Sequence, residues 1–218
     1  MTQYAFHLDG GKCTGCKTCQ VACKETYKLP VSNLYRKVYN YQGGSWKPTE
    51  AGHYVPDGVF GYFVSLACNH CSSPACVANC PTGAMQKDEE TGIVWTDHDV
   101  CIGCKTCETA CPYGAPTYGE EEGYMLKCDM CRGEVAAGGK PICVTGCPMR
   151  ALDFGTREEM IEKYGEGDVE VEPLPADTTG PNLILTPHRD AQKSGSGTGS
   201  VVNLEEELLS LIHISEPT

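Results

Sequence analysis

Residues 101–116 read CIGCKTCETACPYGAP, and the spacing of their four cysteines decides the fold. Cys101, Cys104 and Cys107 follow at intervals of three residues, whereas Cys111 comes four residues later and precedes a proline. On a regular helix three thiols at this interval drift around the axis, and on a strand they alternate between the two faces, so neither element gathers them around one object. We therefore expect a loop curled around a compact object, eased by Gly103 because glycine accepts positive φ angles. The fourth cysteine follows residues that can start a helix, so it points elsewhere.

All sixteen cysteines of this 218-residue chain fall into four groups of four. Groups one and three share the spacing C-x2-C-x2-C-x3-C, while the second gap widens to four residues in group two and to eleven in group four. Such repetition is improbable by chance and indicates one kind of site built several times. The members, group by group, are Cys13, Cys16, Cys19 and Cys23; Cys68, Cys71, Cys76 and Cys80; Cys101, Cys104, Cys107 and Cys111; and Cys128, Cys131, Cys143 and Cys147.

Disulfides, zinc and iron–sulfur clusters are the three uses that could consume so many cysteines. The N-terminus has neither a signal peptide nor a twin-arginine pattern, so we expect synthesis in a reducing cytosol, where disulfides are rare. Zinc sites usually separate two C-x2-C pairs by a longer spacer, and only group four has that form. In C-x2-C-x2-C-x3-C-P runs the fourth cysteine binds the other cluster of a pair. The pattern predicts iron–sulfur clusters, with a zinc scaffold as the weaker alternative.

The formal net charge of −12 argues against a nucleic acid partner, because phosphate binding requires a basic surface. Solubility is the simpler reason for such a charge. The sequence also has no apolar run long enough to span a bilayer, so we expect no direct membrane span.

Short strands are predicted on either side of the cysteine groups. Residues 84–87 and 93–96, between groups two and three, are expected to form a hairpin around the turn at residues 90–92. Residues 4–8 (YAFHL) precede group one and residues 151–154 (ALDF) follow group four. If these two strands pair, groups one and four form an outer unit and groups two and three an inner unit nested within it. The predicted fold class is α+β, with two ferredoxin-like units.

The expected boundaries follow from this nesting. The outer unit covers residues 1–60 and 115–165, and the inner unit covers residues 61–114. Residues 165–191 are rich in Pro, Gly and acidic residues, so we expect few core residues and an extended segment over 166–200 that contacts a partner. Residues 194–200 (SGSGTGS) are typical of a flexible linker. Residues 201–218 are left uncertain: a short amphipathic helix that docks on a partner is one interpretation of residues 203–218, but residues 209–218 (LSLIHISEPT) resemble a translated sequencing adapter rather than native protein.

The motifs resemble one family in particular, the four-cluster electron-transfer subunits of dimethyl sulfoxide reductase-type molybdoenzymes. The resemblance covers roughly residues 1–190 and rests on CTGCKTCQVACK, SLACNHCSSPACVANCPTGAM, DVCIGCKTCETACPYGAP, KCDMCRGEVAAGGKPICVTGCPMRALDFG and PNLILTP. Relatives with a three-iron cluster lack the second cysteine of group three. Here that position is Cys104, so the resemblance implies four [4Fe–4S] clusters.

The resemblance also implies which cysteines share a cluster, in agreement with the exchange of fourth ligands. The ligand sets are Cys13, Cys16, Cys19 and Cys147 for cluster 1; Cys23, Cys128, Cys131 and Cys143 for cluster 2; Cys68, Cys71, Cys76 and Cys111 for cluster 3; and Cys80, Cys101, Cys104 and Cys107 for cluster 4. His70, with four thiols in each set already, is interpreted as a hydrogen-bonding neighbour or a packed side chain. Lys17, Lys24, Lys105, Lys127 and Arg132 flank ligands, where they either raise cluster potentials or face solvent and partners.

The implied function is electron relay in anaerobic respiration, between a quinol-side integral membrane anchor and a molybdopterin-containing catalytic subunit. The chain itself is expected to have no catalytic residues. It would fold in the cytoplasm and attach to the membrane through its partners, with co-export alongside the catalytic subunit as one route. The alternative is a free polyferredoxin that shuttles electrons between soluble oxidoreductases. The terminal substrate and the direction of electron flow are not encoded in this chain.

Overall fold

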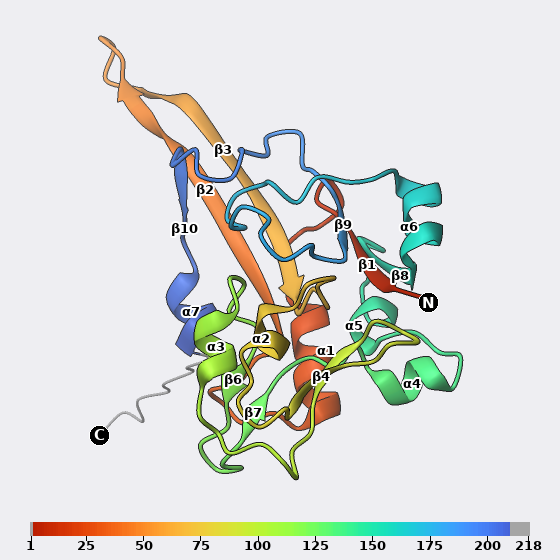
Figure 1. Ribbon diagram of the computed structural model, residues 1–218. Coiled ribbons are helices and arrows are strands. Elements are labelled where there is room, and N and C mark those ends of the chain that lie inside the picture. Colours follow the sequence, from red (N-terminus) through yellow and green to blue (C-terminus); the bar gives the residue numbers. More distant parts are fainter. Residues whose placement is uncertain (1, 210–218) are drawn as a thin grey trace.

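A computed structural model describes residues 2–209 and shows a body of short helices and strands from which one long hairpin projects (Figure 1). A three-stranded sheet has the order β8-β1-β9. Strand β1 (Tyr4–Asp9) pairs antiparallel with β8 (Leu152–Thr156) and parallel with β9 (Leu183–Thr186). The predicted pairing of residues 4–8 with residues 151–154 is therefore confirmed. The mixed helix and strand content fits the predicted α+β class.

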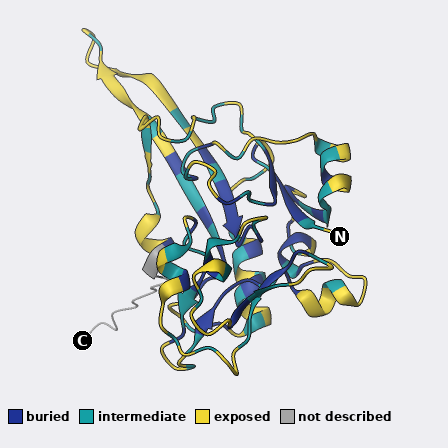
Figure 2. Cartoon of the chain, in the orientation of Figure 1, coloured by how far each residue is buried: buried dark blue, intermediate teal, exposed yellow. Residues whose placement is uncertain are grey.

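The hairpin was not foreseen from the sequence. Its strands are β2 (Arg36–Pro48) and β3 (Tyr54–Ala67), and β10 (Gly199–Val201) pairs with β2 on the other side. The inner halves of β2 and β3 are largely buried and the outer halves exposed, as Figure 2 shows. The boundary expected between residues 60 and 61 falls inside β3.

The cysteine loops lead into short helices. Helix α1 (Thr18–Tyr27) begins within group one, after Cys16, and α3 (Thr106–Ala110) begins at the same point of group three, after Cys104. The other elements of this part are α2 (Ala75–Ala78), β4 (Met85–Lys87), β5 (Val94–Thr96), β6 (Thr117–Tyr118), β7 (Met125–Leu126), α4 (Arg132–Ala136) and α5 (Ile142–Thr145). The predicted hairpin between groups two and three is confirmed, because β4 pairs antiparallel with β5.

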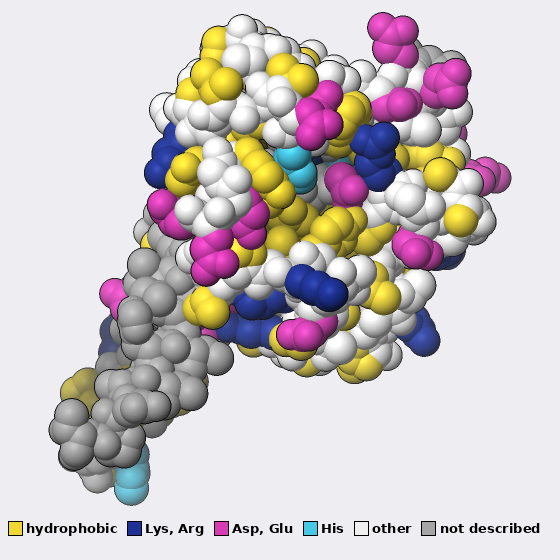
Figure 3. All heavy atoms as spheres, turned by 90° about the horizontal axis from the view of Figure 1, so that it is seen from below, with side chains coloured by type: hydrophobic (Ala, Val, Ile, Leu, Met, Phe, Trp, Pro, Cys, Tyr) yellow, Lys and Arg dark blue, Asp and Glu magenta, His cyan; other side chains and the backbone are white. Residues whose placement is uncertain are grey.

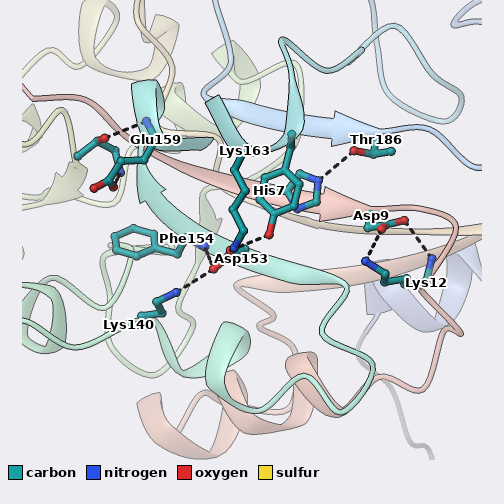
Figure 4. Close-up of polar contacts among 11 residues, drawn as sticks. His7, Asp9, Lys12, Lys140, Asp153, Phe154, Glu159, Lys163 and Thr186 are labelled. Carbon is teal, nitrogen blue, oxygen red and sulfur yellow. Dashed lines mark hydrogen bonds and ion pairs between the residues drawn. The ribbon is translucent and has the colours of Figure 1, made fainter. Parts of the chain in front are cut away.

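One carboxylate holds helix α6 (Arg157–Tyr164) against the β8-β1-β9 sheet (Figure 4). Asp153 on β8 accepts hydrogen bonds from Lys140 Nζ (2.8 Å), Lys163 Nζ (2.7 Å) and the Tyr164 hydroxyl (2.8 Å). Burial works against ionisation of Asp153, but these donors outweigh it and lower its pKa. The Tyr164 ring also stacks on buried His7 of β1, with centroids 3.5 Å apart. Helix and sheet are thus fixed to each other.

The C-terminal segment corrects the expectation of few core residues over 165–191. Leu174, Leu183, Ile184 and Leu185 are buried, and the Tyr62 hydroxyl on β3 donates to the carbonyl of Glu172. The composition of this stretch is polar overall, so these few apolar side chains gave no clear signal of a core. Three of them become buried because β9 pairs with β1. Contact of residues 166–200 with a partner stays a prediction.

Residues 194–200 are likewise not simply a flexible linker, because Gly199 begins β10. Helix α7 (Leu204–Leu209) follows and lies against β2, where buried Glu207 accepts a hydrogen bond from Val38 N at 3.0 Å. The predicted non-native stretch, residues 209–218, lies outside the described residues except for the last residue of α7.

The surface carries scattered charge. Acidic side chains and Lys or Arg side chains are both spread over the face in Figure 3, with hydrophobic side chains towards the centre. Over residues 2–209, every helix is too short or too polar to cross a bilayer.

Candidate metal centres

Groups one and three form the same local structure. Gly15 and Gly103 have φ angles of 68° and 66°, and Lys17 and Lys105 have φ angles of 58° and 60°. A left-handed residue just before the helix turns the chain sharply, so that three thiols are presented from one loop. The predicted curl is therefore present in both copies.

The structure brings together the four cysteines expected at cluster 1. Cys13, Cys16, Cys19 and Cys147 line one cavity, whose wall also includes Val38 of β2 and Ser65 of β3. The first three thiols come from the loop before α1 and the first turn of that helix, whereas Cys147 follows α5, far along the chain. A thiol from a distant group thus lines the same cavity as three thiols of group one.

Two further cavities each contain one expected set of four. The first is lined by Cys68, Cys71, Cys76 and Cys111, together with Lys127 and Thr179. The second is lined by Cys80, Cys101, Cys104 and Cys107, together with Met85 and Met125. Each again combines three thiols of one group with the last thiol of another.

The remaining four cysteines, Cys23, Cys128, Cys131 and Cys143, are those expected at cluster 2, and burial acts on them most strongly. Burial raises the pKa of Cys23, and the neighbouring thiols of Cys143 and Cys131 raise it further. Burial likewise raises the pKa of Cys128, with contributions from Cys23, from Cys68 of a neighbouring set and from Cys143. All four thiols are buried, so this is the most enclosed of the four sets.

Most of these thiols lie where a free thiolate is costly. Burial raises the pKa of Cys13 and Cys71 to about 11 and that of Cys76 to about 12. Cys16 and Cys104 differ, because hydrogen bonds from Thr18 and Thr106 lower their pKa values. Bound iron cations would offset the free-energy cost of ionising these buried thiols.

Hydrogen-bond donors already point at several sulfurs. The backbone N–H groups of Met85, Met125 and Met130 each lie 3.4 Å from a cysteine Sγ, at Cys80, Cys101 and Cys128 respectively. Such donors stabilise the negative charge of cluster-bound thiolates. In residues 2–209 no three His, Cys, Asp or Glu side chains are arranged to hold a single metal ion. Four thiols around each of three cavities, with N–H donors to sulfur, fit iron–sulfur clusters.

His70 connects two of the sets. It is fully buried in the loop of group two, and its Nδ1 accepts the N–H of Val94 at 2.9 Å. The neutral ring therefore carries its hydrogen on Nε2, which lies 3.8 Å from Cys128 Sγ. Burial, together with Lys127 and Lys87, keeps the pKa of His70 well below its usual value. The interpretation of His70 as a hydrogen-bonding neighbour is confirmed.

The five flanking cations have different surroundings. Lys127 is buried and donates to the carbonyl oxygens of Val94 and Cys128, and Lys24 donates to the carbonyl of Pro30. The other three have partly or fully exposed side chains with their own contacts: Lys17 pairs with exposed Glu206 and buried Glu207, Lys105 lies over the ring of Tyr118, and Arg132 lies over the ring of Trp95.

Three polar residues beside the thiols were missed from the sequence: Arg36, Ser65 and Thr179. Thr179 Oγ1 donates to Cys71 Sγ at 3.2 Å, and Ser65 Oγ lies 3.3 Å from Cys19 Sγ. They come from β2, β3 and the segment before β9, far along the chain from the cysteines they approach. Nothing in their local sequence signals this role.

Comparison with known proteins agrees with the chemistry of these sites. A family described as "4Fe-4S dicluster domain" matches residues 59–157, and one described as "4Fe-4S binding domain" matches residues 11–31. The sequence is 48% identical to the B chain of anaerobic dimethyl sulfoxide reductase from Escherichia coli (strain K12), over 94% of this chain and 98% of that protein. It is 45% identical to the corresponding B chain from Haemophilus influenzae, over 94% and 100%.

A more distant relative has a different name. The B subunit of sulfite dehydrogenase from Allochromatium vinosum is 34% identical, over 71% of this chain and 69% of that protein. With sixteen cysteines and two matching 4Fe–4S families, the protein binds four [4Fe–4S] clusters. It is a non-catalytic electron-transfer subunit and belongs to the family of the anaerobic dimethyl sulfoxide reductase B chains.

Proposed function

We propose that this chain relays electrons between a quinol-side membrane anchor and a molybdopterin-containing catalytic subunit, in a reductase that acts on dimethyl sulfoxide or a similar oxide. The observation that carries the proposal is the continuity of the cysteine sets. Thiols of neighbouring sets influence one another, Cys19 with Cys143 and Cys128 with Cys68. Sets three and four are joined through α2, because Cys76 and Cys80 belong to different sets. We infer that an electron passes from set to set along this series.

The ligand sets are part of this proposal. Cluster 1 is held by Cys13, Cys16, Cys19 and Cys147; cluster 2 by Cys23, Cys128, Cys131 and Cys143; cluster 3 by Cys68, Cys71, Cys76 and Cys111; and cluster 4 by Cys80, Cys101, Cys104 and Cys107. The shared cavities support three of these sets. Cluster 1 would face the catalytic subunit and cluster 4 the membrane anchor.

A nested arrangement of two ferredoxin-like units is likewise proposed. The β1–β8 pairing joins residues before group one to residues after group four, and the β4–β5 hairpin lies between groups two and three. Both pairings support an inner unit inserted in an outer one. This chain would fold in the cytoplasm, join the complex there and be attached to the membrane only through its partners.

One observation supports the alternative, a free polyferredoxin. The segment after residue 165 was expected to have little use in a free ferredoxin, yet its buried leucines pack on its own chain. Packing of this kind serves a monomer as well as a subunit. The names of the relatives and the length of their similarity favour the subunit.

Anaerobic purification from the native host tests the two functions. We expect the chain to copurify with a large molybdopterin protein and to contain about sixteen iron atoms, since each [4Fe–4S] cluster holds four. Reduced clusters should be reoxidised by dimethyl sulfoxide only while that partner is present. A stable, fully loaded monomer that exchanges electrons with soluble oxidoreductases would instead establish the shuttle.

A further inference from the structure

Arg36, the first residue of β2, is a buried charge without a carboxylate partner in residues 2–209. Only 2% of its surface is exposed. Removing a guanidinium from water is unfavourable unless an opposite charge or a full set of hydrogen bonds replaces the solvent. A buried arginine in this position therefore requires an explanation.

Protein groups satisfy only part of its hydrogen-bonding capacity. Nη1 donates to the backbone oxygen and to Oγ of Ser65, each at 3.1 Å. The ring of Phe6 lies 4.9 Å from Cζ. Nε and Nη2 are buried and have no partner in the part of the chain that the structure describes. All these contacts are neutral, so they leave the charge uncompensated and two donor nitrogens free.

Cysteines of two different sets surround this guanidinium. Burial alone would lower the pKa of Arg36, but the thiols of Cys143, Cys19, Cys128 and Cys23 outweigh burial and raise it. Cys19 belongs to the set of cluster 1, and the other three belong to the set of cluster 2. Ser65 Oγ connects the charge directly to one of them, since it lies 3.1 Å from Nη1 and 3.3 Å from Cys19 Sγ.

We propose that Arg36 is the shared counter-charge of clusters 1 and 2, and that it raises the reduction potentials of both. This inference rests on the ligand sets of the proposed function. A cluster held by four thiolates is negative, and the electron that arrives from a neighbouring cluster adds one more negative charge until it leaves for the next. No bond forms or breaks in that step. A fixed cation favours the more negative state, and the free Nε–H and Nη2–H donors are available to sulfur.

Redox titration of the assembled complex, followed by electron paramagnetic resonance, tests the role of Arg36. In Arg36→Gln we expect lower potentials at clusters 1 and 2 and unchanged potentials at clusters 3 and 4. Arg36→Lys, which keeps the charge, should shift them less. Arg157→Gln is the matched control, because this partly exposed arginine pairs with Glu166 and should leave all four potentials unchanged.

A fully loaded Arg36→Gln complex with unchanged potentials at clusters 1 and 2, or with equal shifts at all four clusters, overturns the proposal. If the Arg36→Gln complex does not assemble, the Arg36→Lys complex tests the proposal in its place. A fully loaded Arg36→Lys complex shows that the charge is what the site needs, whereas failure of both variants assigns Arg36 a purely structural role. A wild-type complex without four reducible clusters would instead contradict the proposed function itself.

Discussion

Groups one and three have the same spacing and nearly the same sequence, CTGCKTC and CIGCKTC, yet they occupy different environments. Their loops agree closely: Cys16 Sγ lies 3.4 Å from Thr18 Oγ1, and Cys104 Sγ lies 3.3 Å from Thr106 Oγ1. The second cysteine of each group is exposed and the third is buried. Local sequence is therefore sufficient to specify the loop.

The two groups diverge at the fourth cysteine. Helix α1 continues through Cys23 to Tyr27, whereas α3 ends at Ala110 and Cys111 is extended, with φ −84° and ψ 115°. The proline after Cys111 explains this, because a residue before proline is disfavoured in the helical region. Cys23 is buried as a result, and Cys111 is only partly so. Similar loops thus place their fourth thiols in surroundings that differ in burial.

The largest effect should come from removing the matching exposed thiols, Cys16 and Cys104. Cys16→Ser should alter only cluster 1 and Cys104→Ser only cluster 4, because each thiol lines a single cavity. Both are exposed, so the loss of packing is small. Iron content and electron paramagnetic resonance of the complex measure the outcome. Disturbance of any other cluster would show that the ligand sets are wrong.

Substitution of the lysines that follow these cysteines should have a smaller effect, on stability rather than on cluster content. Lys17 Nζ lies 2.9 Å from the buried carboxylate of Glu207 on α7, whereas Lys105 lies 3.7 Å from exposed Glu120. Lys17→Ala should cost about 1–3 kcal/mol, because it leaves a buried acceptor less well paired. Lys105→Ala should cost less than about 1 kcal/mol, as surface ion pairs do.

Amide hydrogen exchange of α7 in the holo complex separates these two variants. Faster exchange is expected in Lys17→Ala and wild-type exchange in Lys105→Ala. Equal protection of α7 in both would mean that Lys17 does not hold this helix, and that the two lysines are equivalent in spite of their different partners.

The smallest change in potential should come from His70, whose ring contacts the Sγ of Cys128, a thiol that we propose binds cluster 2 together with Cys23 of group one. His70→Phe removes the Nε2–H donor to Cys128, so the potential of cluster 2 should fall while that of cluster 4 stays unchanged. His70→Gln, which keeps a donor, is the control and should show a smaller shift. If a redox titration gave the same cluster 2 potential for His70→Phe and His70→Gln, this hydrogen bond would be excluded as a determinant of that potential.

The sequence predicted the elements that depend on neighbours along the chain. The curled loops follow from cysteine spacing and Gly15 or Gly103, and the β4–β5 hairpin follows from two short β-prone runs around a turn. The β1–β8 pairing was also predictable, because both strands flank cysteine groups. The long β2–β3 hairpin was not, since its exposed outer half carries no clear alternation of polar and apolar residues.

The sequence by itself determined which cofactor is bound, through sixteen cysteines in four groups whose offset fourth positions predict exchange of ligands between groups. Only the tertiary structure decided the surroundings of these thiols. It buries Arg36 between two sets, brings His70 to Cys128 and packs Leu183, Ile184 and Leu185 against the body. Spacing is a local property that the backbone enforces within a few residues, whereas burial and charge depend on segments far apart in the chain that meet only when the whole chain folds.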